Sequence, residues 1–159
     1  MAALIERRAL LKALGASTVA LAAAACGKTP ASTVAGAATP GTPADFSQNV
    51  GDRVLFTVDS SQINPSAAAT LDRQAAWLAR YPRYQITLEG HADERGTREY
   101  NIALSARRAD AAKNYLASRG VSPGRIRTLS FGKERPVAVC DAESCWSQNR
   151  RAVTVLASA

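Results

Sequence analysis

Apolar residues are concentrated in several short stretches with the composition of β-strands, and in one of them, residues 85–90, apolar and polar positions alternate. Residues 54–58 read Val-Leu-Phe-Thr-Val, and residues 85–90 read Gln-Ile-Thr-Leu-Glu-Gly. β-Branched and aromatic side chains at a period of two fit a strand with one buried face. Residues 126–131 and 152–156 have a similar composition and predict two further strands.

Between the first two strands, apolar side chains recur with a helical period. Leu71, Ala75 and Leu78 follow one another at spacings of four and three residues, which places them on one face of a helix. Asn64-Pro65 supplies a capping side chain followed by proline at the first helical position. The helix should end near Tyr81, because the residue before a proline disfavours helical backbone.

A second helix is expected from about Glu99 to Arg119, with Gly120 as its C-terminal stop. The chain then reads strand, helix, strand, helix, strand, loop, strand. This order is typical of an α/β (α+β) two-layer sandwich, in which helices cover one face of a mixed sheet. Because a strand–helix–strand unit crosses over right-handed, the first two strands are expected to run parallel.

The first 25 residues form a separate segment with a basic start and an apolar, small-residue run over 13–25. This pattern is typical of a secretory signal, and the run is short for a permanent membrane span; a buried Ala-rich helix is the alternative. Leu21 to Cys26 resembles a lipobox, although Ala23 stands where leucine is favoured, and it predicts cleavage before a lipidated Cys26. Arg7-Arg8 fits either twin-arginine or general export.

Residues 26–49 carry three prolines among small and polar residues and have no apolar period. Such composition is typical of a flexible linker. The expected organisation is a signal peptide over 1–25, a lipidated cysteine with its linker over 26–49, and one folded domain over 50–159.

The net charge of +7 and the pI near 9.8 raise the question of a nucleic-acid partner. Nucleic-acid binding predicts basic side chains interleaved with exposed aromatic ones. Few aromatic residues neighbour the arginines in question, which are Arg80, Arg83, Arg119, Arg125 and Arg127. The predicted export signal would also separate the protein from the nucleic acids of the cell, so we expect no nucleic-acid partner.

Three cysteines leave one unpaired thiol unless one is modified. If Cys26 carries lipid, Cys140 and Cys145 remain, and an oxidising compartment favours a disulfide between them. A metal site on this pair would lack further ligands, since His91 is the only histidine. We therefore expect no metal, and we expect His91 to be a hydrogen-bonded residue at a strand end. Trp146 is expected to serve packing.

Two acids follow predicted strands: Asp59 comes directly after the first, and Asp93 lies just beyond the second. Ligands collect outside the carboxyl ends of strands in open sheets, so both acids are expected at one crevice. Either acid alone would suit a turn or a helix cap. The pair favours a binding site.

Arg108 lies on the predicted apolar stripe of the second helix. The other members of that stripe are Tyr100, Leu104, Ala111 and Tyr115. A guanidinium that faces the core needs a carboxylate, either an internal one such as Asp93 or one from a ligand, which it can hold bidentately. A crevice with acids and one inward arginine suits a zwitterionic ligand.

Five segments together resemble the OmpA-like domain family, and the similarity covers nearly all of residues 50–157. The run from Gly90 to Thr97, Gly-His-Ala-Asp-Glu-Arg-Gly-Thr, resembles in particular the peptidoglycan-associated lipoproteins (Pal) within that family. The segments are Val54–Asp59, Leu88–Thr97, Glu99–Arg108, Ser130–Pro136 and Asn149–Ala152.

The resemblance implies an OmpA-like fold that binds the meso-diaminopimelate of peptidoglycan without cleaving it. By position, Asp93 would meet the ammonium of that residue and Arg108 its carboxylate. Asp59, Arg95 and backbone groups near Thr97 would line the same pocket. Val58 departs from the aromatic or larger apolar residue that is common in the family, and many members lack the Cys140–Cys145 pair.

The resemblance also implies an outer-membrane lipoprotein that faces the periplasm. It implies the Tol-Pal system, with TolB and other Tol proteins as partners, and a role in envelope constriction during division. The alternative is a cell-wall hydrolase that uses Asp59, Asp93 and Glu94 as acid and base. An inward arginine opposes it, because a nearby cation lowers the pKa of an acid where a general acid needs it raised. We expect no enzyme and no cofactor.

Overall fold

A computed structural model describes residues 38–158 of the chain. Its helices and strands follow in the order α1 (Pro43–Asp45), the π-helical turn η1 (Phe46–Gly51), β1 (Arg53–Leu55), α2 (Pro65–Arg80), β2 (Tyr84–Gly90), α3 (Arg98–Ser118), the 3₁₀ turn η2 (Pro123–Arg125), β3 (Ile126–Ser130), α4 (Glu143–Asn149) and β4 (Arg151–Ser158). None of the described helices is long and apolar enough to cross a membrane. The signal peptide, Cys26 and the first part of the expected linker lie outside the described residues.

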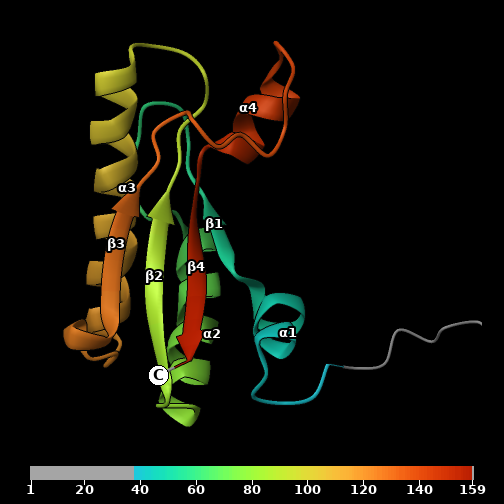
Figure 1. Ribbon diagram of the computed structural model, residues 1–159, viewed down its shortest axis with the longest axis vertical. Coiled ribbons are helices and arrows are strands. Elements are labelled where there is room, and N and C mark those ends of the chain that lie inside the picture. Colours follow the sequence, from blue (N-terminus) through green and yellow to red (C-terminus); the bar gives the residue numbers. More distant parts are fainter. Residues whose placement is uncertain (1–37, 159) are drawn as a thin grey trace, which may run out of the picture. The chain divides into compact units, whose positions relative to one another are not determined.

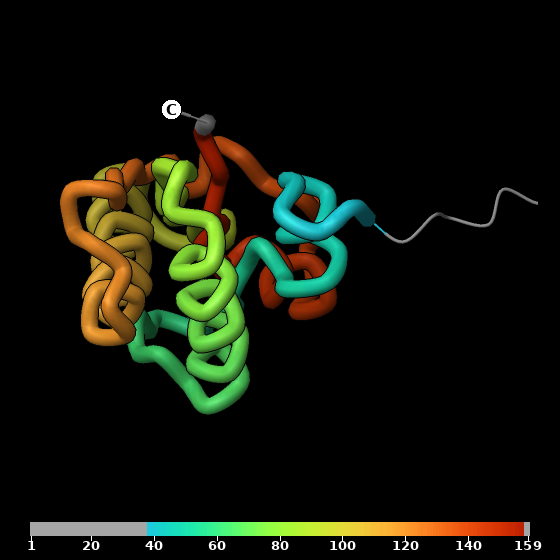
Figure 2. The backbone as a smooth tube through the Cα atoms, turned by 90° about the horizontal axis from the view of Figure 1, so that it is seen from below, coloured from blue at the N-terminus to red at the C-terminus, as the bar shows by residue number. Residues whose placement is uncertain are grey.

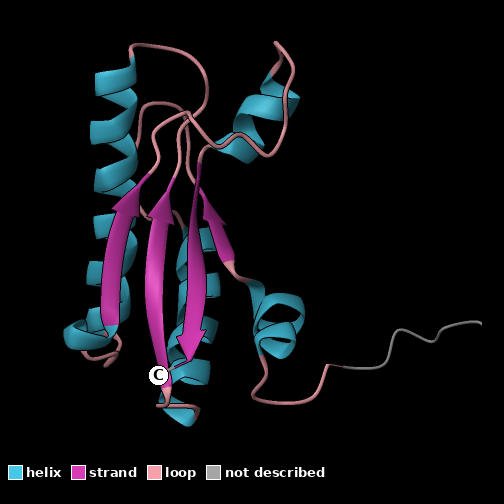
Figure 3. Ribbon diagram, in the orientation of Figure 1, coloured by secondary structure: helices cyan, strands magenta, loops and turns pink. Residues whose placement is uncertain are grey.

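The four strands form one mixed sheet in the order β1-β4-β2-β3, and α2 and α3 lie on one of its faces (Figures 1 and 3). β4 runs antiparallel to both β1 and β2, while β2 and β3 are parallel. The expected two-layer α/β fold is therefore confirmed, and β1 and β2 share a direction as predicted. They are not neighbours, however, because the last strand inserts between them.

Local signals fix the start of each long helix. The side chain of Asn64 accepts a hydrogen bond from the backbone N–H of Ala67, and Pro65 opens α2 as expected. α3 begins after Thr97, whose hydroxyl accepts from the N–H of Tyr100 at 3.2 Å. Capping side chains such as these satisfy N–H groups that have no partner inside the helix.

The face that α3 turns to the sheet differs from the predicted stripe. Leu104 and Arg108 are buried as expected, whereas Tyr100 is 41% exposed. The other buried members are Asn101, Ser105, Ala109, Ala112 and Leu116. Small side chains among them let the helix approach the strands closely, and a search for large apolar residues alone passes over them.

The folded domain begins earlier than residue 50, so the expected linker boundary is wrong. The side chain of Phe46 is 1% exposed and packs against the ring of Trp77, with the ring centroids 4.9 Å apart. The indole N–H of Trp77 donates to Asp45 at 2.8 Å. Figure 2 shows this N-terminal segment lying along the side of the domain, away from α3. A buried aromatic ring and a few hydrogen bonds thus dock a segment whose composition looks like a linker.

Candidate ligand-binding site

A pocket of about 310 Å³ lies where β1 and β2 end and α3 begins. The structure brings together four of the five predicted ligand-binding residues there, namely Asp59, Asp93, Arg95 and Arg108. The remaining lining residues are Val58, Gly96, Tyr100, Asn101 and Leu104. Thr97 itself is not among them; its side chain caps α3, and its neighbour Gly96 lines the pocket.

Arg108 carries a buried positive charge without a carboxylate partner among the described residues. Its side chain is 0% exposed. The guanidinium donates to three backbone carbonyl oxygens: those of Ser60 at 2.9 Å, His91 at 2.9 Å and Thr57 at 3.2 Å. A guanidinium has five N–H donors, so two remain. Burial lowers the pKa of Arg108 to about 10, which still leaves the group charged at neutral pH.

Asp93 pairs with two other arginines, so an internal Asp93–Arg108 ion pair is not present. Nη2 of Arg95 donates to Oδ2 of Asp93 at 2.6 Å, and Nη1 of Arg150 donates to the same oxygen at 3.3 Å. Burial acts to raise the pKa of Asp93, but the hydrogen bonds from Arg95 and Arg150 outweigh it and the pKa is lowered. Asp93 is thus held as a carboxylate anion.

Arg150 is a residue of the site that sequence reasoning missed. It is 4% exposed and also donates to the carbonyl oxygen of Phe56 at 3.1 Å and to Glu143. The next residue, Arg151, is directed to different partners and donates to the carbonyl oxygen of Arg135. The signal was the Arg-Arg pair just before the last strand, where Arg150 follows the end of α4 and Arg151 begins β4.

Asp59 stands on the other side of the pocket. Its backbone has φ of +51°, a left-handed conformation that Asp tolerates better than most residues. The hydroxyl of Tyr100 donates to its carboxylate. Asn101, which was also missed, donates from Nδ2 to the carbonyl oxygen of Arg95 at 2.8 Å and so holds the loop before α3.

Glu94 does not join the two aspartates. Its carboxylate accepts from the indole N–H of Trp146 at 2.7 Å, and it does not line the pocket. A hydrolase would need an acid with a raised pKa, whereas the pKa of Asp93 is lowered. The pocket therefore has acids and an arginine that could hold a zwitterion, and the placement of Glu94 and the lowered pKa of Asp93 do not favour the hydrolase.

The two remaining sequence predictions concern cysteine and histidine. Cys140 and Cys145 form a disulfide, as expected, with 5.7 Å between their Cα atoms. His91 is buried, but neither ring nitrogen has a hydrogen-bond partner among the described residues, so its expected side-chain hydrogen bond is wrong. Its ring stacks on Phe131 instead. No group of three or more potential metal ligands occurs within residues 38–158.

Comparison with known proteins gives concordant matches in sequence and in fold. Residues 55–151 match the OmpA family. The chain is 70% identical over 125 residues to a protein of Rhizobium meliloti (strain 1021) named peptidoglycan-associated lipoprotein, which covers 79% of this chain and 71% of the relative. A protein of the same name from Pasteurella multocida (strain Pm70) is 42% identical over 130 residues, covering 82% and 87%.

Two solved structures share the fold. The crystal structure of the peptidoglycan-associated lipoprotein from Burkholderia pseudomallei matches with a TM-score of 0.68 and 36% identity, over 73% of this chain and 100% of that one. The C-terminal domain of Helicobacter pylori MotB, at 24% identity, matches over 68% and 85% with a TM-score of 0.63 and is alike in fold alone. The names of these relatives describe lipoproteins. This chain belongs to the OmpA family and, within it, to the peptidoglycan-associated lipoproteins.

Proposed function

We propose that this domain binds peptidoglycan non-covalently by holding the side-chain end of meso-diaminopimelate in the pocket. The observation that carries the proposal is the buried Arg108, which has two unused N–H donors and no carboxylate partner among the described residues. Three carbonyl oxygens already orient the guanidinium, so it is ready to hold a carboxylate bidentately.

The rest of the pocket suits an ammonium beside that carboxylate. Asp59 accepts one hydrogen bond, from Tyr100, and Asp93 accepts from two arginines. A carboxylate offers about four acceptor positions. Asp93 accepts four hydrogen bonds, three from Arg95 and one from Arg150, so Asp59 is the acid that keeps capacity for a further donor, while Asp93 contributes its negative charge. The volume of about 310 Å³ suits the end of one side chain rather than a glycan strand. Uncrosslinked diaminopimelate presents an ammonium and a carboxylate on one carbon, which matches this arrangement.

The test compares two stem peptides that differ only at this position. A muropeptide with diaminopimelate should bind in calorimetric titration, and one with lysine, which lacks the second carboxylate, should bind at least about 30-fold more weakly. Arg108→Met should reduce binding of the diaminopimelate peptide by a similar factor. Arg107→Met removes an exposed arginine one position away and serves as the control. Equal affinity for both peptides would refute the proposal.

We extend the proposal to the whole protein on the strength of its sequence. Cys26 would carry lipid that anchors the chain in the outer membrane, with the domain in the periplasm. Cys26→Ser should abolish incorporation of labelled palmitate and release the domain from the membrane fraction. If palmitate incorporation and membrane fractionation of this variant matched those of the wild type, Cys26 would not be the lipid-anchored residue.

The proposed partners and cellular role rest on the family resemblance. They are TolB and other Tol proteins, in a system that draws in the outer membrane during division. Co-purification of TolB with the wild-type chain from its own cells would support this role. Its absence, together with normal division in a deletion strain, would contradict it.

A further inference from the structure

We infer that Trp146, which lies in α4 directly after Cys145, is a positioning residue that holds the segment from Asp93 to Gly96 in its ligand-binding form. The loop that carries it spans residues 137–149 and contains the Cys140–Cys145 disulfide and α4. The inference rests on the proposed function and names a residue that does not itself line the pocket. It follows from contacts between this loop and the residues that surround Asp93.

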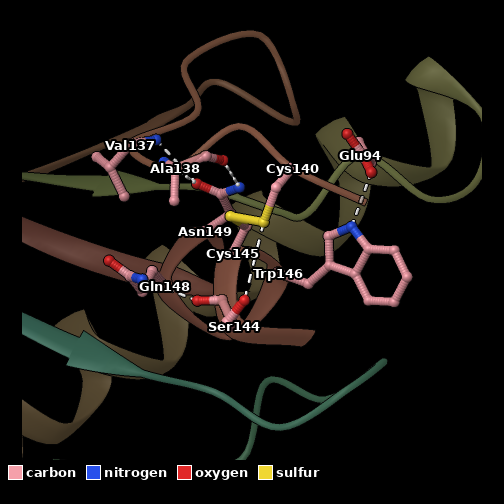
Figure 4. Close-up of a disulfide and its surroundings, with 9 residues drawn as sticks. All are labelled: Glu94, Val137, Ala138, Cys140, Ser144, Cys145, Trp146, Gln148 and Asn149. Atoms are coloured by element: carbon pink, nitrogen blue, oxygen red, sulfur yellow. Dashed lines mark hydrogen bonds between the residues drawn. A yellow bond between two sulfur atoms is a disulfide. The ribbon is translucent and has the colours of Figure 1, made fainter. Parts of the chain in front are cut away.

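Trp146 contacts both residues that follow Asp93. Its indole N–H donates to Oε1 of Glu94 at 2.7 Å (Figure 4). The guanidinium carbon of Arg95 lies over its ring, 4.2 Å from the ring centroid. A cation over an indole face is attracted by the ring quadrupole. One side chain therefore restrains two neighbouring positions of the binding loop.

Arg95 is the residue that most needs such restraint. Its side chain is 40% exposed, yet it forms the short hydrogen bond to Asp93 and lines the pocket. A long arginine side chain loses considerable rotamer freedom when it is held in one place. Stacking on Trp146 restricts the Arg95 side chain before a ligand binds, so this loss of conformational entropy is not part of the binding free energy. Preorganisation of this kind improves affinity.

The same loop also holds the second cation beside Asp93. Glu143, in the first turn of α4, accepts from Arg150, which in turn donates to Asp93. Both arginines that contact Asp93 are therefore held from the other side by α4, Arg95 by Trp146 and Arg150 by Glu143. The loop therefore supports the Asp93 carboxylate through both of the arginines that contact it.

The loop depends on cross-links, because a seven-residue helix has little stability of its own. The Cys140–Cys145 disulfide closes it at one end (Figure 4). At the other end Asn149 accepts from the N–H groups of Val137 and Ala138 and donates to the carbonyl oxygen of Ala138. These links hold Trp146 against the segment from Asp93 to Gly96.

A double-mutant cycle with the diaminopimelate muropeptide tests the inference. Trp146→Ala should weaken binding about threefold to tenfold, while Trp146→Phe, which keeps a ring under Arg95, should stay within about twofold of wild type. In an Arg95→Ala background, Trp146→Ala should have a clearly smaller effect, because only its hydrogen bond to Glu94 remains to be lost. Gln148→Ala, at an exposed position of α4, is the matched control. Unchanged affinity of Trp146→Ala, or additive losses, would overturn the inference.

The disulfide variant Cys140→Ser/Cys145→Ser should weaken binding in the same direction as Trp146→Ala, and the two changes together should be less than additive. Circular dichroism checks that each variant is folded. If binding is unchanged without the disulfide, the loop does not contribute to the positioning of Trp146.

A measurement without ligand separates this inference from the proposed function. The pKa of Asp93, followed by NMR of its carboxyl carbon, should rise in Trp146→Ala as the pairing with Arg95 loosens, and should not rise in Trp146→Phe. If the wild-type domain bound neither peptide, the proposed function would fail while this measurement would still decide the positioning role. If Arg108→Met lost binding and Trp146→Ala did not, only the inference would fail.

Discussion

Gly90 in β2 and Ser105 in α3 meet with no room for a side chain between them. A Cβ on Gly90 would stand 1.9 Å from the carbonyl oxygen of Ser105. The contact lies at the end of the strand that leads to Asp93, and it keeps Arg108, one turn further along α3, within reach of the carbonyl oxygen of His91. The close approach of helix and strand thus sets the geometry of the pocket.

Gly90→Ala should therefore cost about 3 kcal/mol or more of unfolding free energy, because the obstructing atom belongs to the backbone and cannot rotate away. Urea denaturation measures this loss. Gly124→Ala is the control, since a Cβ there would meet only a side-chain oxygen of Ser122 at 3.8 Å. Equal midpoints for the two variants would contradict the role of Gly90.

Phe46 ties the N-terminal segment to the domain. Phe46→Ala should lower the unfolding free energy by about 3–5 kcal/mol, since it removes a buried ring that packs on Trp77. Ser47→Ala, at the next and exposed position, should change it by less than about 0.5 kcal/mol. Thermal unfolding of the two variants would show whether residues before 50 belong to the fold.

His91 makes stability depend on pH. Burial, with Arg151 and Arg135 nearby, lowers the pKa of His91 to about 4; Glu89, whose Oε2 lies 3.9 Å from Nε2, is the acid beside the ring. Between about pH 6.5 and 4 the unfolded chain therefore binds a proton that the folded domain does not. The unfolding free energy should fall across this window, by roughly 3 kcal/mol in total.

The variant His91→Phe keeps a ring to stack on Phe131 and removes the titration. Its unfolding free energy should vary less between pH 6.5 and 4 than that of the wild type. Urea titrations at several pH values measure both curves, and curves of equal slope would assign the dependence to other groups.

Arg125 contributes to the positive net charge of the chain and also supports the end of α2. Its guanidinium donates to the carbonyl oxygens of Leu78 at 3.3 Å and Tyr84 at 2.9 Å. Arg125→Met should cost about 1–3 kcal/mol, because these oxygens lose a charged donor. Arg127→Met, at an exposed position of β3, should have little effect. Chemical denaturation distinguishes the two.

Local patterns were sufficient for most of the pocket. Asp59 and Asp93 were placed by their position after strands, and Arg108 by its spacing on a helix. Arg150 was not predicted, because telling it from Arg151 requires knowing the path of the chain between the end of α4 and the start of β4. The position of β4 itself was not predictable from local patterns, since the strand pairs with segments far away in the sequence.

Trp146 shows a different limit of sequence reasoning. Packing was expected for it, but its contacts with Glu94 and Arg95 depend on the path of an irregular loop. The disulfide could be predicted from cysteine count and compartment. The position of the loop that it closes could not be predicted, because no periodic pattern sets the direction of that loop.

The described chain enters the domain beside α1, at the end of the sheet opposite to the pocket (Figure 1). With an anchor at Cys26 and a ligand in the pocket, as we propose, tension between membrane and wall would run along the strands. The hydrogen bonds that join β1 to β4 lie across that direction, so they would be loaded in shear and would share the force. The hydrogen bonds from Arg83 and Tyr84 to the carbonyl oxygen of Gly41 would take the pull first, before the contacts of Asp45 and Phe46 with Trp77. These few contacts would then form the mechanical coupling between tether and domain.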